Sequence, residues 1–447
     1  MGVAPGRRSA QPAPVTHEAS NQAADPGLPA RAAALDLLAA ALEGRTGLDE
    51  GLNAPALGKL APRDRAFARA LVMAALRGLG PIDRALQDRL RKAPPDVVVN
   101  ILRLGAAQAL LLGTPPHAAV GATVTLADRT PAARPFKGLV NAVLRALTRE
   151  PPPLDDPEAL SPPWLYARWR AAYGEAEARA VAALIAAEPA TDLSLKPGED
   201  AAALAEALPG EVLPGGTVRT DRRGDLTAWP GFAEGRWWVQ DASAAVPARL
   251  LAVQAGETAL DLCAAPGGKT LQLAAAGARV TAVDRSPQRL KRLSENLART
   301  GLAADVVAAD AADWPDRRRF DAVLLDAPCS ATGTFRRHPD VLWAARPSDV
   351  VSLAALQARL LDAAGRRVKP GGRLVYCVCS LEPEEGEAQV AGFLARAPEF
   401  SLSPIAEGEG GSPTESLNPD GTLRILPHHR AGGTDGFYIA RFTRAAA

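Results

Sequence analysis

The sequence predicts a multidomain protein in which an all-α domain precedes a small α+β domain and a larger α/β, Rossmann-like domain. The chain of 447 residues is about three times as long as a typical domain of roughly 150 residues. Its hydrophobic periodicity changes twice, and three consecutive prolines interrupt it at 151–153. We therefore expect a disordered tail at 1–27, helices at 28–150, a linker and α+β domain at 151–239, and the Rossmann-like domain at 240–447.

The composition is that of a soluble globular protein. The chain is 47% hydrophobic and 23% charged, without an uninterrupted run of about 18 apolar residues that could span a membrane. No apolar segment follows Arg7 and Arg8, as a secretory signal would require. The four cysteines, all between Cys263 and Cys379, are too few for a disulfide scaffold and suggest a reducing compartment. We expect a monomeric, cytoplasmic protein that makes no membrane contact.

Apolar residues recur at helical spacing throughout 28–150, as in the stripe formed by Leu35, Leu38 and Leu42. Prolines stand where helices would begin, at positions where the missing backbone N–H costs nothing. The region is also basic: residues 1–150 carry 19 Lys and Arg against 12 Asp and Glu, whereas the remainder carries 32 against 38. A polyanion-binding helical domain explains this excess, and an ordinary solvated helical surface explains it nearly as well.

The middle region combines helical spacing at 164–187 with short extended segments at 192–196 and 216–219. From residue 241 onward, short apolar runs alternate with helical stretches, which predicts a doubly wound, mostly parallel sheet. Ligands of such sheets bind at the carboxyl ends of the strands. The five strands expected here are Thr258–Cys263, Arg279–Asp284, Asp305–Asp310, Phe320–Asp326 and Gly372–Cys379.

A loop of small residues joins the first of these strands to a helix expected at 271–276. Such a loop lets the backbone approach a ligand, and the helix N-terminus presents free N–H groups. Gly268, Lys269 and Thr270 match the second half of a phosphate-binding P-loop, but Cys263 stands where its first glycine must be, which argues against an NTPase. The cofactor-binding residues expected in the loop are Cys263, Ala264, Ala265, Pro266, Gly267, Gly268 and Lys269.

Two of the strands end in acidic residues that suit a nucleoside. Asp284 can accept hydrogen bonds from a ribose diol, with Arg285 beside it, and Asp310 can accept one from an adenine amino group. Carboxylates at adjacent strand ends would repel a triphosphate but attract a cationic sulfonium. We therefore expect S-adenosylmethionine as the cofactor. The alternative is that these residues are ordinary turn and capping carboxylates.

Cys329 and Cys379 follow two neighbouring strand ends, so both thiols could reach one substrate. The alternatives are a metal site, for which this pattern is a weak signature, and a buried structural role; we expect no metal. A thiolate beside a methyl donor suits methylation of a pyrimidine at C5, because addition to C6 pushes electron density onto C5. A second group then removes the C5 proton. Asp326 could hydrogen-bond N3 or the exocyclic amine of cytosine during the addition.

These motifs resemble those of the bacterial RNA (cytosine-C5) methyltransferases. The segment Asp261–Thr270 matches the family's cofactor motif without a mismatch, and Asp326–Ser330 matches its proline–cysteine motif. The resemblance implies that Cys379 is the nucleophile that adds to C6 and that Cys329 assists proton removal and release. Val378 stands where the family usually has threonine.

The N-terminal region resembles the helical domain, similar to the antitermination factor NusB, of the RsmB subfamily. The resemblance rests on Gly105–Leu110, Pro115–Val120 and Lys137–Arg145. It implies that 16S ribosomal RNA or an assembling small subunit is the substrate, and we expect Arg336 and Arg337 to hold phosphates beside the target base. A P-loop NTPase and a non-catalytic RNA-binding or antitermination factor are the alternatives; the loop sequence disfavours the first, and the two intact cysteine motifs disfavour the second.

Overall fold

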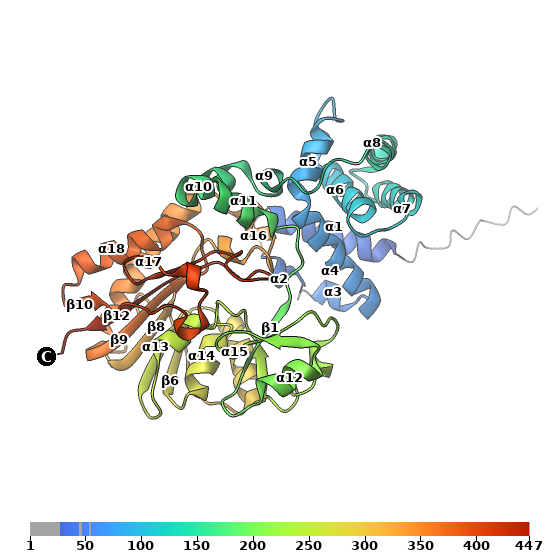
Figure 1. The fold of residues 1–447 in the computed structure, drawn as a ribbon. Helices are drawn as coiled ribbons and strands as arrows, with labels where there is room; N and C mark the ends of the chain where they lie inside the picture. Colours follow the sequence, from blue (N-terminus) through green and yellow to red (C-terminus); the bar gives the residue numbers. More distant parts are fainter. Residues whose placement is uncertain (1–26, 44–46, 53–54, 447) are drawn as a thin grey trace, which may run out of the picture.

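The computed structural model describes residues 27–43, 47–52 and 55–446. The N-terminal helices lie at one end of the molecule and a large mixed sheet lies at the other, with a smaller sheet beneath them (Figure 1). The tail predicted at 1–27 lies outside the described residues apart from its last residue. None of the helices in the described ranges is long and apolar enough to cross a membrane.

Helices alone build the N-terminal part, and prolines mark their starts as the sequence predicts. Pro62 and Pro116 are the first residues of two helices, and Pro95 is the residue before a third. The elements are α1 (Leu28–Leu42), α2 (Leu48–Leu52), α3 (Pro55–Gly58), α4 (Pro62–Arg77), α5 (Leu79–Gln87), α6 (Asp96–Leu110), α7 (Pro116–Arg129), η1 (Arg134–Phe136) and α8 (Lys137–Arg149).

The centre of this helical domain is α6, which is buried on nearly all sides as its apolar composition predicts. Ile101 and Leu102 are fully excluded from solvent and belong to one apolar cluster that extends over α1, α4, α7 and α8. At Gly105 the neighbouring helices come so close that a Cβ atom would lie 2.7 Å from Leu144 and 2.8 Å from Thr123. A glycine is therefore required at the crossing, and burial of the shared apolar surface holds the helices together.

The region 151–239, predicted as a linker and one α+β domain, is divided in the structure: its helices and its strands belong to two different apolar clusters. Its helices lie on the large domain rather than on the small sheet, because Trp169 shares an apolar cluster with Phe335 and Leu381. Gly174, with φ of 89°, divides the helical stretch expected at 164–187 into two helices. The helices are α9 (Pro157–Leu160), α10 (Pro163–Tyr173) and α11 (Glu175–Ala183).

The extended segments of this region form an antiparallel sheet in the order β2-β3-β1-β4. Leu193, Val218 and Trp237 are fully buried in its own small core. One helix covers the sheet, so this part is the small α+β unit that the sequence predicts. The elements are β1 (Thr191–Leu195), α12 (Ala201–Ala207), β2 (Gly210–Val212), β3 (Val218–Thr220), η2 (Leu226–Ala228) and β4 (Trp237–Val239).

The large sheet has the order β10-β12-β9-β8-β5-β6-β7, with β11 paired to β12. Strands β9, β8, β5, β6 and β7 are parallel, whereas β12 joins them in the antiparallel direction. The chain order reverses between β5 and β8, and in doubly wound sheets a ligand crevice opens at such a point. The strands are β5 (Thr258–Leu262), β6 (Arg279–Asp284), β7 (Asp305–Ala308), β8 (Phe320–Asp326), β9 (Val368–Val378), β10 (Phe400–Leu402), β11 (Leu423–Ile425) and β12 (Phe437–Arg444).

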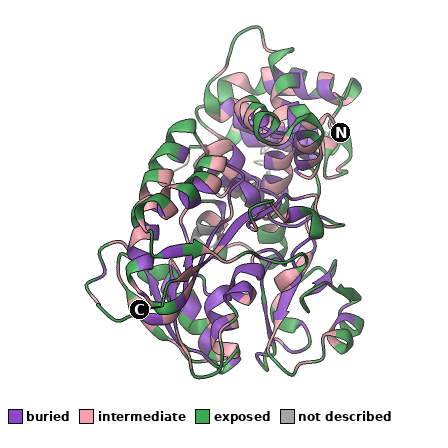
Figure 2. Cartoon of the chain, turned by 60° about the vertical axis from the view of Figure 1, so that its left-hand side comes forward, coloured by how far each residue is buried: buried purple, intermediate pink, exposed green. Residues whose placement is uncertain are grey.

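Helices cover both faces of this sheet. Its strands are therefore coloured mostly as buried in Figure 2, whereas the helices around them carry exposed residues on their outer sides. The segment between Val323 and Leu325 is fully buried, which explains its unbroken apolar sequence. The helix expected to begin at residue 271 begins three residues earlier, at Gly268, because Gly267, with φ of 112°, turns the chain sharply after β5. The helices are α13 (Val246–Leu251), α14 (Gly268–Ala275), α15 (Pro287–Thr300), α16 (Asp340–Ala344), α17 (Pro347–Arg366) and α18 (Glu387–Arg396), with short 3-10 turns at η3 (Thr332–Thr334), η4 (Pro383–Glu385), η5 (Glu409–Gly411) and η6 (Thr414–Ser416).

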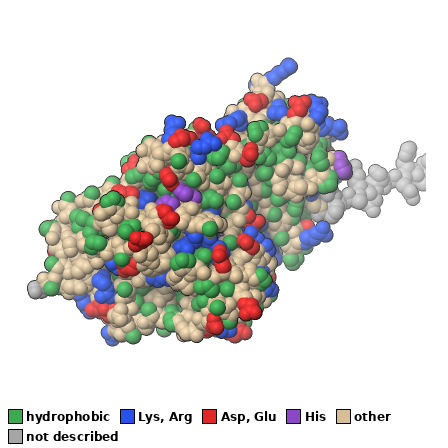
Figure 3. Space-filling model, in the orientation of Figure 1, with side chains coloured by type: hydrophobic (Ala, Val, Ile, Leu, Met, Phe, Trp, Pro, Cys, Tyr) green, Lys and Arg blue, Asp and Glu red, His purple; other side chains and the backbone are tan. Residues whose placement is uncertain are grey.

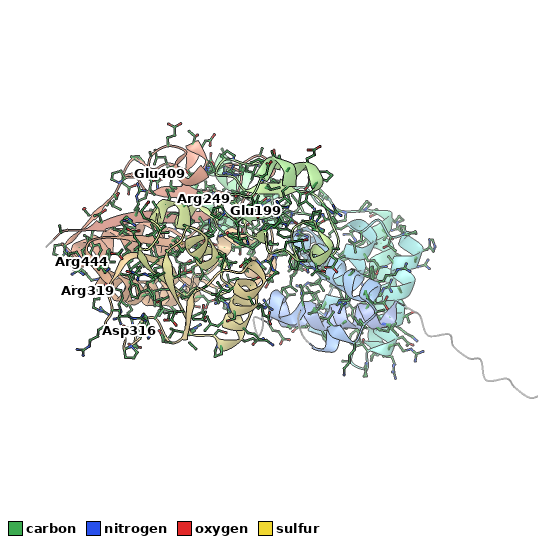
Figure 4. All side chains as sticks on the ribbon, turned by 90° about the horizontal axis from the view of Figure 1, so that it is seen from below. Glu199, Arg249, Asp316, Arg319, Glu409 and Arg444 are labelled. Atoms are coloured by element: carbon green, nitrogen blue, oxygen red, sulfur yellow. The ribbon has the colours of Figure 1, made fainter. Side chains whose placement is uncertain are left out.

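The helical domain is docked on the segment that follows the proline–cysteine motif. Three hydrogen bonds join the two: Leu48 N–H donates to Asp340 Oδ2 (3.0 Å), Arg77 donates to Arg336 O (3.0 Å), and Trp343 Nε1–H donates to Leu76 O (3.1 Å). Viewed from below, the labelled residues Asp316, Arg319 and Arg444 lie at the opposite end of the large domain (Figure 4). The helical domain therefore lies beside the carboxyl ends of the strands.

Candidate active site

The two thiols predicted to act together are neighbours in the structure. Strands β8 and β9 are parallel, and their register places Asp326 opposite Cys377, so the chain leaves both strands at the same edge. As a result, Cys329 Sγ lies 3.5 Å from Cys379 Sγ. Both cysteines are free. The hydrogen bond to Cys379, together with burial, raises the pKa of the Cys329 thiol well above its ordinary value.

Glu385 ties the two cysteine loops together. Its buried carboxylate accepts hydrogen bonds from the backbone N–H of Ser330 (2.9 Å) and from the hydroxyls of Ser330 and Ser380, which follow the two cysteines in sequence. Gln357 Nε2 donates both to the same carboxylate (3.0 Å) and to Pro328 O (2.9 Å). A single carboxylate thus fixes the spacing of two loops that are 50 residues apart in sequence.

Asp326 and Lys269 form an ion pair at the end of β8, with Nζ 2.8 Å from Oδ2. Burial alone would lower the pKa of Lys269, but the Asp326 carboxylate more than compensates and raises it. The second carboxylate oxygen, Oδ1, is 3.5 Å from Cys377 Sγ. Lys269 is therefore committed to Asp326, whereas the lysine of a P-loop reaches for phosphate. This pairing supports the prediction that the loop is not that of an NTPase.

The loop between β5 and α14 is held by Asp284 at the end of β6. The Asp284 side chain is 3% exposed and accepts hydrogen bonds from the backbone N–H groups of Ala265 (3.1 Å) and Ser286 (2.8 Å). Cys263 adopts a φ of 62°, which opens the loop before Gly267 turns the chain into α14. A Cβ at Gly267 would lie 2.8 Å from Leu293, so the close approach of α15 requires glycine.

The site carries a negative potential. Burial raises the pKa of Asp261 to about 7, and the nearby charges of Asp326 and Asp284 add to the shift. Burial and the same three carboxylates also raise the pKa of Cys263. Carboxylates that interact at this range disfavour an anionic ligand and favour a cationic one.

The remaining residues predicted to bind the cofactor surround this loop. Asp310 is exposed two residues beyond β7, where its carboxylate accepts from Ala312 N–H at 2.9 Å. Arg285 and Pro266 are exposed, whereas Ala264 and Ala265 are buried in the floor of the loop. The structure thus gathers these residues at the carboxyl ends of β5, β6 and β7.

The alternative of a metal site at the cysteines gains no support from the geometry. Among the residues that the structure describes, one group has ligand atoms close enough to share an ion, Glu177 with His428 and His429, within 4.8 Å of one another. It contains neither Cys329 nor Cys379.

Arg336 is buried, and the partly buried Arg337 is engaged by carboxylates, so the structure speaks against the prediction that they hold RNA phosphates. Arg336 is 1% exposed and donates to Gly432 O at 2.8 Å. Arg337 donates to Asp241 at 2.7 Å and lies 3.5 Å from Asp435. The Arg337 charge lowers the pKa of the buried Asp241 carboxyl despite its desolvation. These arginines instead fix the segment after the proline–cysteine motif to the segments that follow β4 and precede β12.

Comparisons with known proteins agree with this geometry. A family model described as 16S rRNA methyltransferase RsmB/F matches residues 248–443, and a NusB family model matches residues 28–149. Ribosomal RNA small subunit methyltransferase B of Salmonella arizonae is 39% identical over 411 residues, covering 86% of this chain and 92% of that protein. The protein of the same name from Cronobacter sakazakii is 37% identical over 412 residues, with the same coverage.

The chain belongs to the RsmB/F family of 16S rRNA methyltransferases. The likeness confirms the predicted family and the predicted order of a NusB-like helical domain and a Rossmann-like methyltransferase domain. Among solved structures, the one titled Crystal Structure of PH0851 has the same fold, with a TM-score of 0.75 and 24% identity over 93% of this chain and 98% of that chain. A methyltransferase homolog from Pyrococcus horikoshii has a TM-score of 0.53 and 27% identity, covering 62% of this chain and 93% of that chain.

Sequence reasoning missed two features of this RsmB/F family site. Gln357 escaped notice because it lies more than 20 residues from either cysteine in sequence, and Glu385 because nothing in the sequence shows that a glutamate five residues after Ser380 also reaches Ser330. Lys269 was expected to bind the cofactor, but its ion pair with Asp326 shows that it also neutralises the end of β8.

The raised pKa of Asp261 predicts a stability that depends on pH. The native state holds a proton on this carboxyl between about pH 4 and pH 7, whereas the unfolded chain, with a pKa of 3.8, releases it. The unfolding free energy of the natural protein should therefore fall, by on the order of 4 kcal/mol, as the pH rises through this range. Asp261→Asn cannot titrate, so denaturant unfolding at several pH values should show a smaller fall. Parallel curves for both proteins would contradict the assignment.

The arrangement around Arg337 predicts a loss of stability rather than a loss of RNA contacts. Arg337→Ala leaves the buried carboxylates of Asp241 and Asp435 without their partner, which should lower the unfolding free energy by about 3 to 5 kcal/mol. Arg337→Lys keeps the charge and should lose less. Denaturant titration measures both. A stable Arg337→Ala protein that binds RNA more weakly would restore the phosphate-binding role.

Proposed function

We propose that this protein transfers a methyl group from S-adenosylmethionine to C5 of a cytosine in 16S ribosomal RNA through a covalent cysteine adduct. The observation that carries the proposal is the contact between the Cys329 and Cys379 thiols at 3.5 Å, beside a carboxylate at the end of β8 and a glycine loop at the end of β5. The activity printed in the names of its relatives is consistent with this reaction. A cytoplasmic monomer stays a prediction.

The residues of the site fit the proposed cofactor. The carboxylates of Asp284 and Asp326 favour a cationic sulfonium, and the start of α14 offers backbone N–H groups to a carboxylate. Asp284 and Asp310 lie near the ends of the neighbouring strands β6 and β7, and we expect them to accept hydrogen bonds from a ribose and from an adenine amine. When bound, S-adenosylmethionine supplies the electrophilic methyl group.

Each protein group then has a separate task. The Cys379 thiolate adds to C6 of the cytosine, and the ring electrons move toward C5. Asp326 accepts a hydrogen bond from the exocyclic amine of the cytosine and so orients the ring for the addition, while Lys269 keeps this carboxylate in place. After methylation, loss of the C5 proton restores the C5–C6 double bond and expels Cys379. Cys329, in contact with the departing sulfur, assists proton removal and release.

The helical domain supplies a basic surface for RNA. Arg63, Arg65 and Arg69 of α4 are exposed, and Lys and Arg side chains are visible on the outer face of this domain (Figure 3). Exposed guanidinium groups contact phosphates without reading sequence. Because the domain is docked beside the catalytic loop, RNA held on it lies near the two thiols.

The two cysteines can be separated by mutation. Cys379→Ala should abolish methylation and also any covalent protein–RNA adduct, because no thiolate remains to add to C6. In Cys329→Ala, Cys379 should still add to C6 of the cytosine, but the RNA should not be released, so that a covalent protein–RNA complex accumulates. Denaturing gel electrophoresis with S-adenosylmethionine and 16S RNA fragments measures both. The buried Cys377, which contacts Asp326 but not the other thiols, provides the matched control: Cys377→Ala should form no trapped adduct.

Two outcomes would change this mechanism. An adduct formed by Cys379→Ala and not by Cys329→Ala would exchange the two roles. Full activity in both variants would rule out the covalent pathway.

The cofactor assignment predicts that Asp284→Ala binds S-adenosylmethionine about 10- to 150-fold more weakly, because one charge-assisted hydrogen bond is lost. Asp284→Asn keeps an acceptor for Ala265 N–H and should lose less affinity. Titration calorimetry gives both affinities. Unchanged affinity in Asp284→Ala, or tight binding of ATP by the natural protein, would overturn the assignment.

A further inference from the structure

Two histidines and a glutamate from distant segments of the chain meet beside α11. Glu177 lies in the first turn of α11, whereas His428 and His429 follow β11. One ligand atom of each of these residues, here called the His–Glu cluster, lies within 4.8 Å of the ligand atoms of the other two. All three residues are partly exposed, and histidine and acidic side chains adjoin one another on the face shown in Figure 3. An ion can therefore reach the cluster from solvent.

A tight turn brings the two successive histidine rings together. In an extended strand, their side chains would point to opposite faces. Here His429 N–H donates to Leu426 O at 3.0 Å, and Pro427 occupies the turn position that its fixed φ favours. The two rings consequently pack edge to face, with their centroids 4.9 Å apart.

Apolar packing places this turn against α11. Leu426 is 4% exposed and shares an apolar cluster with Ala178 and Val181 of that helix. Ser416 Oγ and Leu426 N each lie 3.3 Å from His429 Nδ1 and so orient the ring. The fold itself therefore holds the side chains of the His–Glu cluster near one another, and a site that is arranged in advance binds its ligand more tightly.

The polar atoms of the cluster lack partners within the described parts of the chain. Glu177 Oε2 and His428 Nδ1 are buried and form no hydrogen bond there. His428 Nε2 lies 2.5 Å from Glu177 Oε2, a distance that requires positive charge at the contact. Glu177 and Glu415 also place negative charge near His429, which favours a cation.

The spacing of the ligand atoms suits a small metal ion. Ligand atoms of a tetrahedral Zn²⁺ ion lie about 3.3 Å apart, since each bond is about 2.0 to 2.1 Å long. This value falls between the 2.5 Å contact and the 4.8 Å limit of the His–Glu cluster, so small side-chain movements would complete the site. Two imidazoles and a carboxylate suit Zn²⁺, whereas Mg²⁺ and Ca²⁺ prefer oxygen ligands.

We propose that Glu177, His428 and His429 bind a Zn²⁺ ion that links α11 to the loop between β11 and β12. Water would hold the fourth position, as in other zinc sites with three protein ligands. Such a site differs from the sequence expectation of no metal, which rests on the cysteine pattern; the His–Glu cluster contains no cysteine.

The linked loop supports the segment after the proline–cysteine motif. Beyond His429 it carries Gly432 and Asp435, the partners of Arg336 and Arg337. An ion at the start of this loop restricts its motion. Because the ion binds the folded chain, it also stabilises the folded protein.

The test uses the full-length protein freed of metal with a chelator, and Zn²⁺ alone as the probe. In calorimetric titration, Glu177→Gln and His429→Gln should each weaken Zn²⁺ binding by at least the roughly 10- to 100-fold that loss of an outer partner of a metal ligand costs. His117→Gln is the matched control, because it removes an exposed imidazole of α7 outside the cluster and should leave the affinity unchanged.

The thiols are the competing Zn²⁺ ligands, and Co²⁺ separates the two kinds of site. Co²⁺ held by the His–Glu cluster should absorb in the visible range without the near-ultraviolet charge-transfer band that a thiolate ligand adds. His428→Gln should lose this visible spectrum. A protein carrying both Cys329→Ala and Cys379→Ala should keep the spectrum and the Zn²⁺ affinity.

Denaturant unfolding gives a readout that does not depend on the stability of the variants, because each protein is compared with and without Zn²⁺. The ion should raise the unfolding midpoint of the natural protein and leave that of Glu177→Gln unchanged. No Zn²⁺ binding by the natural protein, equal affinity in Glu177→Gln, or a Co²⁺ spectrum that disappears with the two cysteines would overturn the site and leave an imidazole–carboxylate ion pair only. Methylation is measured in none of these experiments, so their outcome is independent of the proposed function.

Discussion

The parallel pairing of β8 with β9 is the constraint on which the candidate site depends. Its register sets Asp326 opposite Cys377, and the segments beyond this pair carry the two remaining thiols to within 3.5 Å of each other. Strand pairing alone does not fix loops that continue past the sheet. Glu385 does so, because its carboxylate receives hydrogen bonds from both loops at once. Sheet register and a buried carboxylate together define the spacing of the two thiols on which the proposed covalent pathway depends.

A second group of charges fixes the segment that follows Cys329, at Arg337. Arg337 lies among the acidic side chains of Asp192, Asp241 and Asp435, which come from three different segments. Ion pairs this deeply buried are costly to break, since each leaves an uncompensated charge. The loop is therefore rigid between Glu385 on one side and Arg337 on the other. Such rigidity agrees with the demands of catalysis better than with adaptable phosphate binding.

Much of the fold followed from the sequence, because each unit has a distinct local pattern. Strand β6 begins and ends where the sequence pattern predicts it, and the cysteine motifs fall at strand ends as expected. The fate of Arg336 and Arg337 could not be predicted, because their partners lie about 100 residues away in either direction and exposure is a tertiary property. Glu385 escaped prediction because its contact with Ser330, 55 residues away, depends on the same tertiary packing. The helices α9 to α11 were assigned to the wrong neighbour for a similar reason, since an apolar face does not reveal what it packs against.

The electrostatics of the site bear directly on its chemistry. The Cys329 thiol resists ionisation because its hydrogen bond to Cys379, its burial and the nearby Glu385 carboxylate all raise its pKa. A cationic ligand in the loop would reduce this resistance, because positive charge nearby stabilises a thiolate. Lys269 cannot provide that charge, since Asp326 already neutralises it. Under the proposed function, a bound cationic methyl donor would therefore be the group that supplies positive charge beside the two thiols.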